Sequence, residues 1–359
     1  MVHSTLLSGL SNASGTLLHL HNCDSMPPLL LSVGLILLGL ALLIKGSDFF
    51  IDGAAEIAKR IGISEMIIGL TLVAFGTSLP EWVSSLIATL RDPSTLQCIE
   101  GLTCNTTDLA LGNVIGSNIT NTGLVIGSIG LMLKNGIEVK KDFLVRDIPL
   151  LIILSIGTWY FALQDNLIGK WEGAGIFIVF LVVMARSLQN LADSEEDSEE
   201  DSESDDDSEL ADVPSWKLYA LTVGGLVGLL IGSNFLVDGA SAIAIALGVS
   251  ESVVGLTMVA FGTSVPELAT SMTAVKRGKH AMFLGGVIGS NSANLAIILG
   301  SVAFLVPVEV TATFTMNQFP IMILFIFGLW ISMLSGRIQR WQSGLLLLGY
   351  LSFTGLQFL

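Results

Sequence analysis

The sequence predicts an all-α, polytopic membrane protein with ten transmembrane helices arranged as two inverted-topology five-helix repeats. Apolar residues make up 52% of the 359 residues and charged residues only 13%, a balance typical of membrane proteins. In addition, residues 46–89 match residues 232–275 without a gap at 24 of 44 positions. The chain is therefore an internal duplication.

Ten apolar runs have the length of a transmembrane helix, about 17 to 25 residues. They lie at residues 28–50, 64–89, 110–133, 147–163, 169–186, 216–246, 250–275, 281–306, 314–334 and 341–358. The second copy starts five runs after the first, and this odd number of crossings turns the second half upside down. We expect an N-terminal tail at 1–27, a first transmembrane repeat at 28–190, a linker at 191–214 and a second repeat at 215–359.

Basic residues predict the orientation of these runs. If the N-terminus is outside, only Arg91 and Lys170 clearly face out, and the other loop Lys and Arg residues fall on the cytoplasmic side. We therefore expect a multi-pass protein of the plasma membrane with both termini outside and the linker in the cytoplasm. Cys98 and Cys104 share one external loop, and whether they form a disulfide stays open.

The linker carries much of the acid in the chain. Of the 31 acidic residues, 13 lie between Ala192 and Asp212, so the rest of the chain is near neutral despite a formal net charge of −15. Its Ser, Asp and Glu composition predicts a disordered segment; a low-affinity Ca²⁺ collector is the alternative, without EF-hand spacing to support it. No basic patch with interleaved aromatics appears, so we expect the lipid bilayer and not nucleic acid as a partner. Nothing in the sequence fixes an oligomeric state.

One duplicated block carries the first chemical signal. GLTLVAFGTSLPE at residues 69–81 returns as GLTMVAFGTSVPE at residues 255–267, and each copy ends on a glutamate, Glu81 or Glu267. A carboxylate inside an apolar run is costly, and neither block holds a basic partner, so we predict a functional role for both.

The same block predicts a break in its helix. Pro80 removes a helix hydrogen bond and disfavours helical geometry at the residue before it. We expect the second and seventh spans to be broken helices, with backbone carbonyls near Ala74 and Ala260 freed from their usual donors. Thr77 and Glu81 then project on one face, as do Thr263 and Glu267 at the same spacing.

A second duplicated block supplies neutral oxygens. LGNVIGSNITNTGLVIG from Leu111 and LGGVIGSNSANLAIILG from Leu284 agree at 9 of 17 positions. Each places a serine and an asparagine four residues apart, and each adds one further amide; the residues are Ser117, Asn121, Ser290, Asn294, Asn118 and Asn291. Carboxylates, hydroxyls and amide carbonyls suit Ca²⁺ or Na⁺ rather than a transition metal. We expect these transported ions and no cofactor.

GTSLPE and GTSVPE, paired with helices that contain GSN, resemble the two α-repeats of the cation/Ca²⁺ exchanger superfamily, specifically its sodium/calcium exchanger branch. The resemblance covers residues 28–358 and implies a secondary antiporter that exchanges Na⁺ for Ca²⁺ by alternating access, with the first and sixth helices sliding across a fixed core. It implies that Glu81 and Glu267 are the central ligands. By the same resemblance the sites are completed by Thr77, Ser78, Thr263, Ser264, Ser117, Asn121 and Ser290, and by the carbonyls of Ala74 and Ala260.

The chain departs from this family at one position. The second GSN helix often has an aspartate where this chain has Asn294. An amide still offers an oxygen, but the K⁺-coupled branch uses an acid there, so we predict K⁺ independence. The proton-coupled branch resembles GNAxE-type motifs, which this chain lacks; this favours Na⁺ as the coupling ion and keeps H⁺-coupled antiport as an alternative.

Two other classes of membrane protein fit the residues less well. A cation-selective channel usually builds its carboxylate rings from several subunits, not from two inverted copies in one chain, so a channel is the less favoured alternative. An intramembrane protease needs a serine with a basic partner, or paired aspartates. The four histidines, His3, His19, His21 and His280, lie in predicted tails or loops, and we expect no enzyme.

Overall fold

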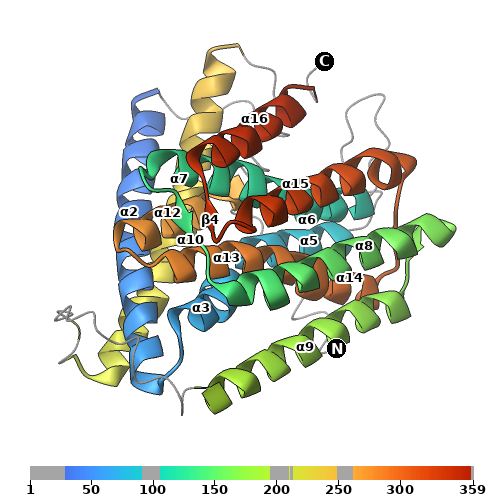
Figure 1. Ribbon diagram of the computed structural model, residues 1–359. Coiled ribbons are helices and arrows are strands. Elements are labelled where there is room, and N and C mark those ends of the chain that lie inside the picture. The colour runs from blue at the N-terminus through green and yellow to red at the C-terminus, as the bar shows by residue number, and fades with distance from the viewer. Residues whose placement is uncertain (1–28, 91–105, 195–209, 211–212, 249–261, 357–359) are drawn as a thin grey trace, which may run out of the picture.

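A computed structural model describes residues 29–90, 106–194, 210, 213–248 and 262–356 (Figure 1). The regular elements within this part of the chain are helices and four two-residue strands. The possible Cys98–Cys104 disulfide, Ala260 and most of the acidic linker lie outside the described residues.

The helices follow the apolar runs closely. The first half contains α2 (Leu29–Ile61), α3 (Glu65–Ile68), η2 (Gly69–Val73), α4 (Ala74–Thr77), α5 (Leu79–Leu90), α6 (Thr106–Thr120), η4 (Asn121–Val125), α7 (Ile126–Met132), β1 (Ile137–Glu138), η5 (Phe143–Asp147), α8 (Ile148–Asp165), β2 (Leu167–Ile168) and α9 (Lys170–Ser194). The second half contains α10 (Ser215–Ala246), α12 (Val265–Lys276), α13 (His280–Ala293), η7 (Asn294–Leu299), α14 (Gly300–Leu305), β3 (Val308–Glu309), η8 (Phe314–Gln318), α15 (Phe319–Met333), β4 (Arg337–Ile338) and α16 (Arg340–Leu356). The η elements are short π-helical segments.

Several of these helices are long and apolar enough to cross a membrane. Within the described ranges six qualify alone: Leu29–Ile61, Ala110–Met132, Phe143–Asp165, Ser215–Ala246, His280–Leu305 and Phe314–Met333. The bent pair Glu65–Thr77 and Leu79–Ile87 forms a seventh if it counts as one span. The protein is therefore an integral, multi-pass membrane protein, as predicted.

The span His280–Leu305, which begins with α13, lies at the centre of the structure. In its apolar stretch, 94% of residues are buried inside the protein, against 22% for the stretch in α2. Close backbone contact explains how α13 fits: a Cβ on Gly285 would lie 2.6 Å from the carbonyl oxygen of Met66 in α3. Figure 1 shows α13 crossing the middle of the bundle, with α2 at its edge.

The helices α2 and α10 pack side by side and antiparallel at one edge of the bundle (Figure 1). Glycines line their interface. A Cβ on Gly39 would lie 2.7 Å from the carbonyl oxygen of Gly232, and one on Gly225 would lie 2.6 Å from the backbone nitrogen of Phe50. Small residues allow two membrane helices to approach this closely, so α2 and α10 form one tightly packed unit.

The two halves share the same order of elements. In each half a helix is followed by a strand, a π-helical segment, a long helix, a second strand and a final helix: α7–β1–η5–α8–β2–α9 and α14–β3–η8–α15–β4–α16. Each strand pairs with a strand of the other half, β1 with β4 and β2 with β3, both antiparallel. These strands were not predicted, because two-residue segments in polar connections leave no periodic signal.

Candidate cation site

Two helix breaks position the glutamates. The chain bends by 40° between α4 and α5, where Ser78 has φ −84° and ψ 4°. Ser264 precedes α12 with almost the same angles, φ −92° and ψ 0°. The prolines that follow lie in the first turn of α5 and α12, where a missing N–H group costs no hydrogen bond. Glu81 and Glu267 therefore lie near the positive end of a helix dipole.

The predicted break is confirmed in the second span, but its expected effect on Ala74 is wrong. The Ala74 carbonyl still accepts a hydrogen bond from the Ser78 N–H group at 3.1 Å. Pro80 has no N–H group to offer the residue four before it, Gly76, but the Gly76 carbonyl accepts another backbone N–H at the end of α4. Ala260 lies outside the described residues, so the corresponding carbonyl of the second half is not compared.

The two carboxylates come together in the protein interior. Glu81 is 1% exposed and Glu267 is 3% exposed, and they lie close enough to interact electrostatically. Thr77 from the first half approaches Glu267, whereas Thr263 from the second half approaches Glu81. Each carboxylate is thus next to a hydroxyl of the other half, and the two halves build one site.

Serines surround Glu267 more closely than Glu81. The Oε1 atom of Glu267 lies 3.5 Å from Ser78 Oγ and 3.4 Å from Ser290 Oγ, which are long hydrogen bonds. The two hydroxyls lie 2.6 Å apart and bond to each other. Ser117 is buried in α6 at 3% exposure. Every predicted ligand except Ala260 lies among the described residues, and all of these are buried except Thr263, which is half-buried.

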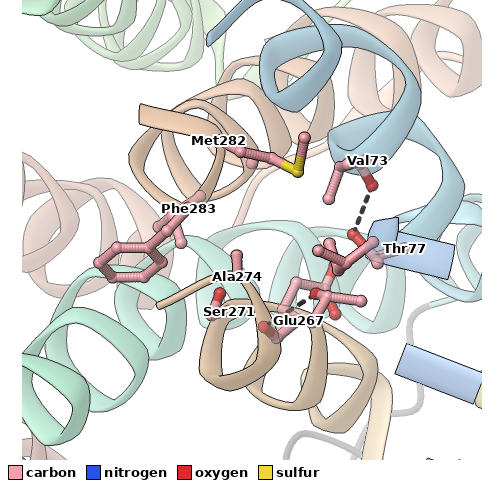
Figure 2. A pocket seen from close by; sticks show the side chains of 11 residues that line it. Val73, Thr77, Glu267, Ser271, Ala274, Met282 and Phe283 are labelled. Carbon is pink, nitrogen blue, oxygen red and sulfur yellow. Dashed lines mark hydrogen bonds between the residues drawn. The ribbon is translucent and has the colours of Figure 1, made fainter. Parts of the chain in front are cut away.

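A small cavity borders Glu267 (Figure 2). Figure 2 shows Thr77 and Glu267 on one side of it and Met282 and Phe283 of α13 on the other. Its volume is about 10 Å³, room for about one water-sized particle. The apolar side chains around it, including Ile51 of α2, are almost completely buried. A single ion fits there, whereas an organic substrate does not.

Four asparagines lie beside the carboxylates, all 0% or 1% exposed. The Nδ2 group of Asn121 donates to Asn291 Oδ1 at 3.1 Å and to Ser290 Oγ at 3.2 Å. Asn294 Nδ2 donates to Asn118 Oδ1 at 3.0 Å. Asn118 Nδ2 donates to the Asn291 backbone carbonyl at 3.2 Å. These bonds join η4 and α6 of the first half to α13 and η7 of the second.

Several buried oxygens at this place have no hydrogen-bond partner among the described residues. They are both carboxylate oxygens of Glu81, Oε2 of Glu267, Oδ1 of Asn121, Oδ1 of Asn294 and Oγ of Ser264. Buried polar atoms are normally paired, so a cluster of unpaired oxygens indicates that a ligand supplies their partner. None of the ion pairs found in the described part of the chain involves Glu81 or Glu267.

The chemistry of this donor set matches a hard cation. The described residues contain no group of three or more His, Cys, Asp or Glu side chains that could hold a metal ion. The site instead combines two carboxylates with hydroxyls and amide carbonyls, which are the ligands of Ca²⁺ and Na⁺. The residues present therefore fit either ion.

Asn113 is a contributor that the sequence analysis missed. Its Nδ2 group donates to the Glu81 carbonyl at 3.0 Å and also contacts Ser84 Oγ and Ser85 Oγ at 3.1 and 2.9 Å. It anchors the first turn of α5, which carries the carboxylate. The signal was present, because Asn113 lies one helical turn before Ser117 on the same face of α6.

Comparison with known proteins identifies the family. Residues 31–189 and 217–359 match the family described as sodium/calcium exchanger protein.

The chain belongs to the sodium/calcium exchanger family.

This is a family of transporters, and relatives match the exchanger chain along nearly its whole length. It is 35% identical to the putative antiporter CaxA of Alkalimonas amylolytica, over 90% of this chain and 97% of the relative. It is 33% identical to the sodium/calcium exchanger MaX1 of Methanosarcina acetivorans, over 89% of this chain and 96% of the relative. A structure of the sodium-calcium exchanger NCX_Mj soaked with zero Na⁺ and Ca²⁺ matches with a TM-score of 0.74 and 31% identity, over 91% of this chain and 99% of that one.

Proposed function

We propose that the chain is a secondary active antiporter that exchanges Na⁺ for Ca²⁺ across a membrane by alternating access. One observation carries the proposal: Glu81 and Glu267, from opposite halves, lie together in the interior among unpaired oxygens. Relatives named as sodium/calcium exchangers support Na⁺ as the coupling ion over H⁺.

The charges of the site suggest why exchange is obligatory. Two ionised carboxylates are neutralised by one Ca²⁺ or by two Na⁺. The unloaded pair would leave two like charges buried without partners, which is strongly unfavourable. A third Na⁺ bound among the neutral oxygens would make the cycle electrogenic, with about 2.3 kcal/mol per charge per 100 mV of membrane potential.

We assign the ligands from the geometry and the resemblance together. The unpaired oxygens of Glu81, Glu267, Asn121, Asn294 and Ser264 are the strongest candidates. Hydroxyls of Thr77, Ser78, Thr263, Ser117 and Ser290 and carbonyls of Ala74 and Ala260 complete the proposed set. The Ala74 carbonyl has a second lone pair, so its bond from Ser78 leaves it able to bind an ion.

The architecture we propose has ten spans in two inverted repeats of five. The repeated order of elements and the crosswise strand pairs support it. The broken pair α3–α5 supplies the second span, α9 the fifth and α16, with 17 residues, the tenth. Among the described residues, α12 contributes to the seventh. Both termini then lie outside the plasma membrane and the acidic linker inside the cell.

Alternating access would come from movement of α2 and α10 across the other helices. Their glycine-lined contact supports movement as one unit. Among the described residues, the polar contacts that join the pair to α12 and the residues flanking it include Ser47 to Thr273 at 2.8 Å, Ser233 to the Gly262 carbonyl at 2.6 Å and Asp52 to Arg277 at 2.8 Å. These bonds are the ones that the proposed sliding must break.

The test is uptake of ⁴⁵Ca²⁺ by proteoliposomes loaded with Na⁺, compared with vesicles that carry K⁺ or a pH gradient instead. Uptake that requires the outward Na⁺ gradient and saturates with Ca²⁺ is the expected result. Uptake driven by the pH gradient would move the chain to the H⁺-coupled alternative. Flux that needs no counter-ion would favour a channel.

A further inference from the structure

The four buried asparagines are not equivalent. Asn121 and Asn294 each leave a side-chain carbonyl unpaired at the site, whereas Asn118 and Asn291 use both ends of their amides in hydrogen bonds. An amide can present either an oxygen or an NH₂ group, and only the oxygen binds a cation. Something in the structure must therefore fix which end of each ligand amide faces the ions.

For Asn294 a series of hydrogen bonds through Asn118 fixes the orientation of the amide. The Asn291 backbone carbonyl only accepts hydrogen bonds, so the NH₂ group of Asn118 must face it, at 3.2 Å. The same NH₂ group lies 3.6 Å from the sulfur of Met322. The Oδ1 atom of Asn118 is then turned toward Asn294, whose NH₂ group donates to it at 3.0 Å. This leaves the Asn294 oxygen toward the site.

We propose that Asn118 is a positioning residue for transport: it sets the orientation of the Asn294 amide, so that this neutral side chain serves as a cation ligand. The inference rests on the proposed function, because it assumes that Asn294 binds the transported ions. Asn118 itself does not touch the ion. The Asn291 backbone carbonyl fixes which end of the Asn118 amide faces it, and Asn118 in turn fixes the orientation of the Asn294 amide.

Asn291 has the corresponding role for Asn121, with a weaker constraint. Its Oδ1 atom accepts from Asn121 at 3.1 Å, and its NH₂ group donates to Thr122 Oγ1 at 3.0 Å. A hydroxyl both donates and accepts, so Thr122 does not by itself force this orientation. Asn121 is held a second time by Ser290 Oγ at 3.2 Å.

The proposal predicts a specific coupling between two substitutions. Asn118→Ala removes the acceptor that holds the Asn294 NH₂ group and lets the amide turn it toward the ion. We expect the dissociation constant for Ca²⁺ to rise by about tenfold, the effect of one lost buried hydrogen bond. In an Asn294→Asp background either carboxylate oxygen can bind the ion, and the oxygen that faces Asn118 Oδ1 meets another acceptor, so there is no hydrogen bond for Asn118 to supply. There Asn118→Ala should raise the constant by less than about threefold.

A crossed control separates positioning from general packing. Asn291→Ala keeps the backbone carbonyl that orients Asn118. The rise in the dissociation constant that Asn291→Ala causes should therefore persist in the Asn294→Asp background. It should become smaller in an Asn121→Asp background instead. A purely structural loss would be the same in every background. The experiment thus comprises two double-mutant cycles, one of Asn118 with Asn294 and one of Asn291 with Asn121, which share no residue.

The measurement is ⁴⁵Ca²⁺ binding to the full-length protein in detergent, together with the KM for Ca²⁺ in Na⁺-driven uptake. Size-exclusion chromatography checks folding, and Asn118→Ser replaces Asn118→Ala in the cycle if the alanine variant aggregates. An equal penalty with and without the Asn294→Asp substitution, with the unmodified protein active, would overturn this inference alone. An unmodified protein that binds no Ca²⁺ would overturn both this inference and the proposed function.

Discussion

Replacing Glu267 by glutamine tests the role of the paired carboxylates most severely. The substitution keeps the shape of the side chain and removes one negative charge from a position that is 3% exposed. A bound Ca²⁺ would then face one carboxylate instead of two. Breaking a buried charge pair by removing one partner costs about 3–5 kcal/mol. At about 1.4 kcal/mol per factor of ten, Ca²⁺ binding should weaken by roughly 10² to 10³·⁵-fold.

The assay is titration of the purified protein with ⁴⁵Ca²⁺, followed by initial rates of Na⁺-driven uptake in proteoliposomes. Glu267→Gln and Glu81→Gln should both abolish exchange while the protein remains folded. Glu309→Gln is the matched control, because Glu309 is an exposed residue in β3, away from the site. A loss of Ca²⁺ affinity smaller than about tenfold in Glu267→Gln would show that the carboxylate does not carry the charge of the ion.

Three further predictions concern the helix pair, the linker and the coupling ion. Gly225→Ala, whose Cβ would lie 2.6 Å from a backbone nitrogen of α2, should lower the free energy of unfolding by about 1–3 kcal/mol in thermal denaturation; Gly224→Ala, with nothing within 4 Å of its Cβ, should not. Deleting residues 195–209, which keeps the contacts of Arg60 with the end of the linker, should leave the initial rate of Na⁺-driven Ca²⁺ uptake unchanged, and a large loss of rate would assign the linker a direct role. Replacing K⁺ by choline should not alter uptake, because Asn294 is neutral; stimulation by K⁺ would contradict this interpretation.

The broad architecture followed from the sequence for clear physical reasons. A membrane requires long apolar helices, so the predicted run at 216–246 and the observed α10, Ser215–Ala246, almost coincide. The proline in each glutamate motif predicted the helix breaks. The cost of a carboxylate inside a membrane indicated a functional role for Glu81 and Glu267. These features are set by local chemistry and are therefore visible in a linear pattern.

Features that depend on contacts between the halves were not predictable. Asn118 was expected to be one more oxygen donor, yet both ends of its amide are bonded within the protein. Its orientation depends on the backbone carbonyl of Asn291, which is distant in sequence. The Ala74 carbonyl keeps its donor because the helix breaks only after the Ser78 N–H group has bonded to it. Such details depend on three-dimensional packing.

The central claim is that one site, built from both halves, holds either Ca²⁺ or Na⁺. The most direct test is displacement of ⁴⁵Ca²⁺ from the purified protein by increasing Na⁺ at constant ionic strength. Complete displacement with a Hill coefficient of about two or more is expected, because at least two Na⁺ must replace the charge of one Ca²⁺. If saturating Na⁺ leaves ⁴⁵Ca²⁺ bound, the two ions occupy independent sites and the account is wrong.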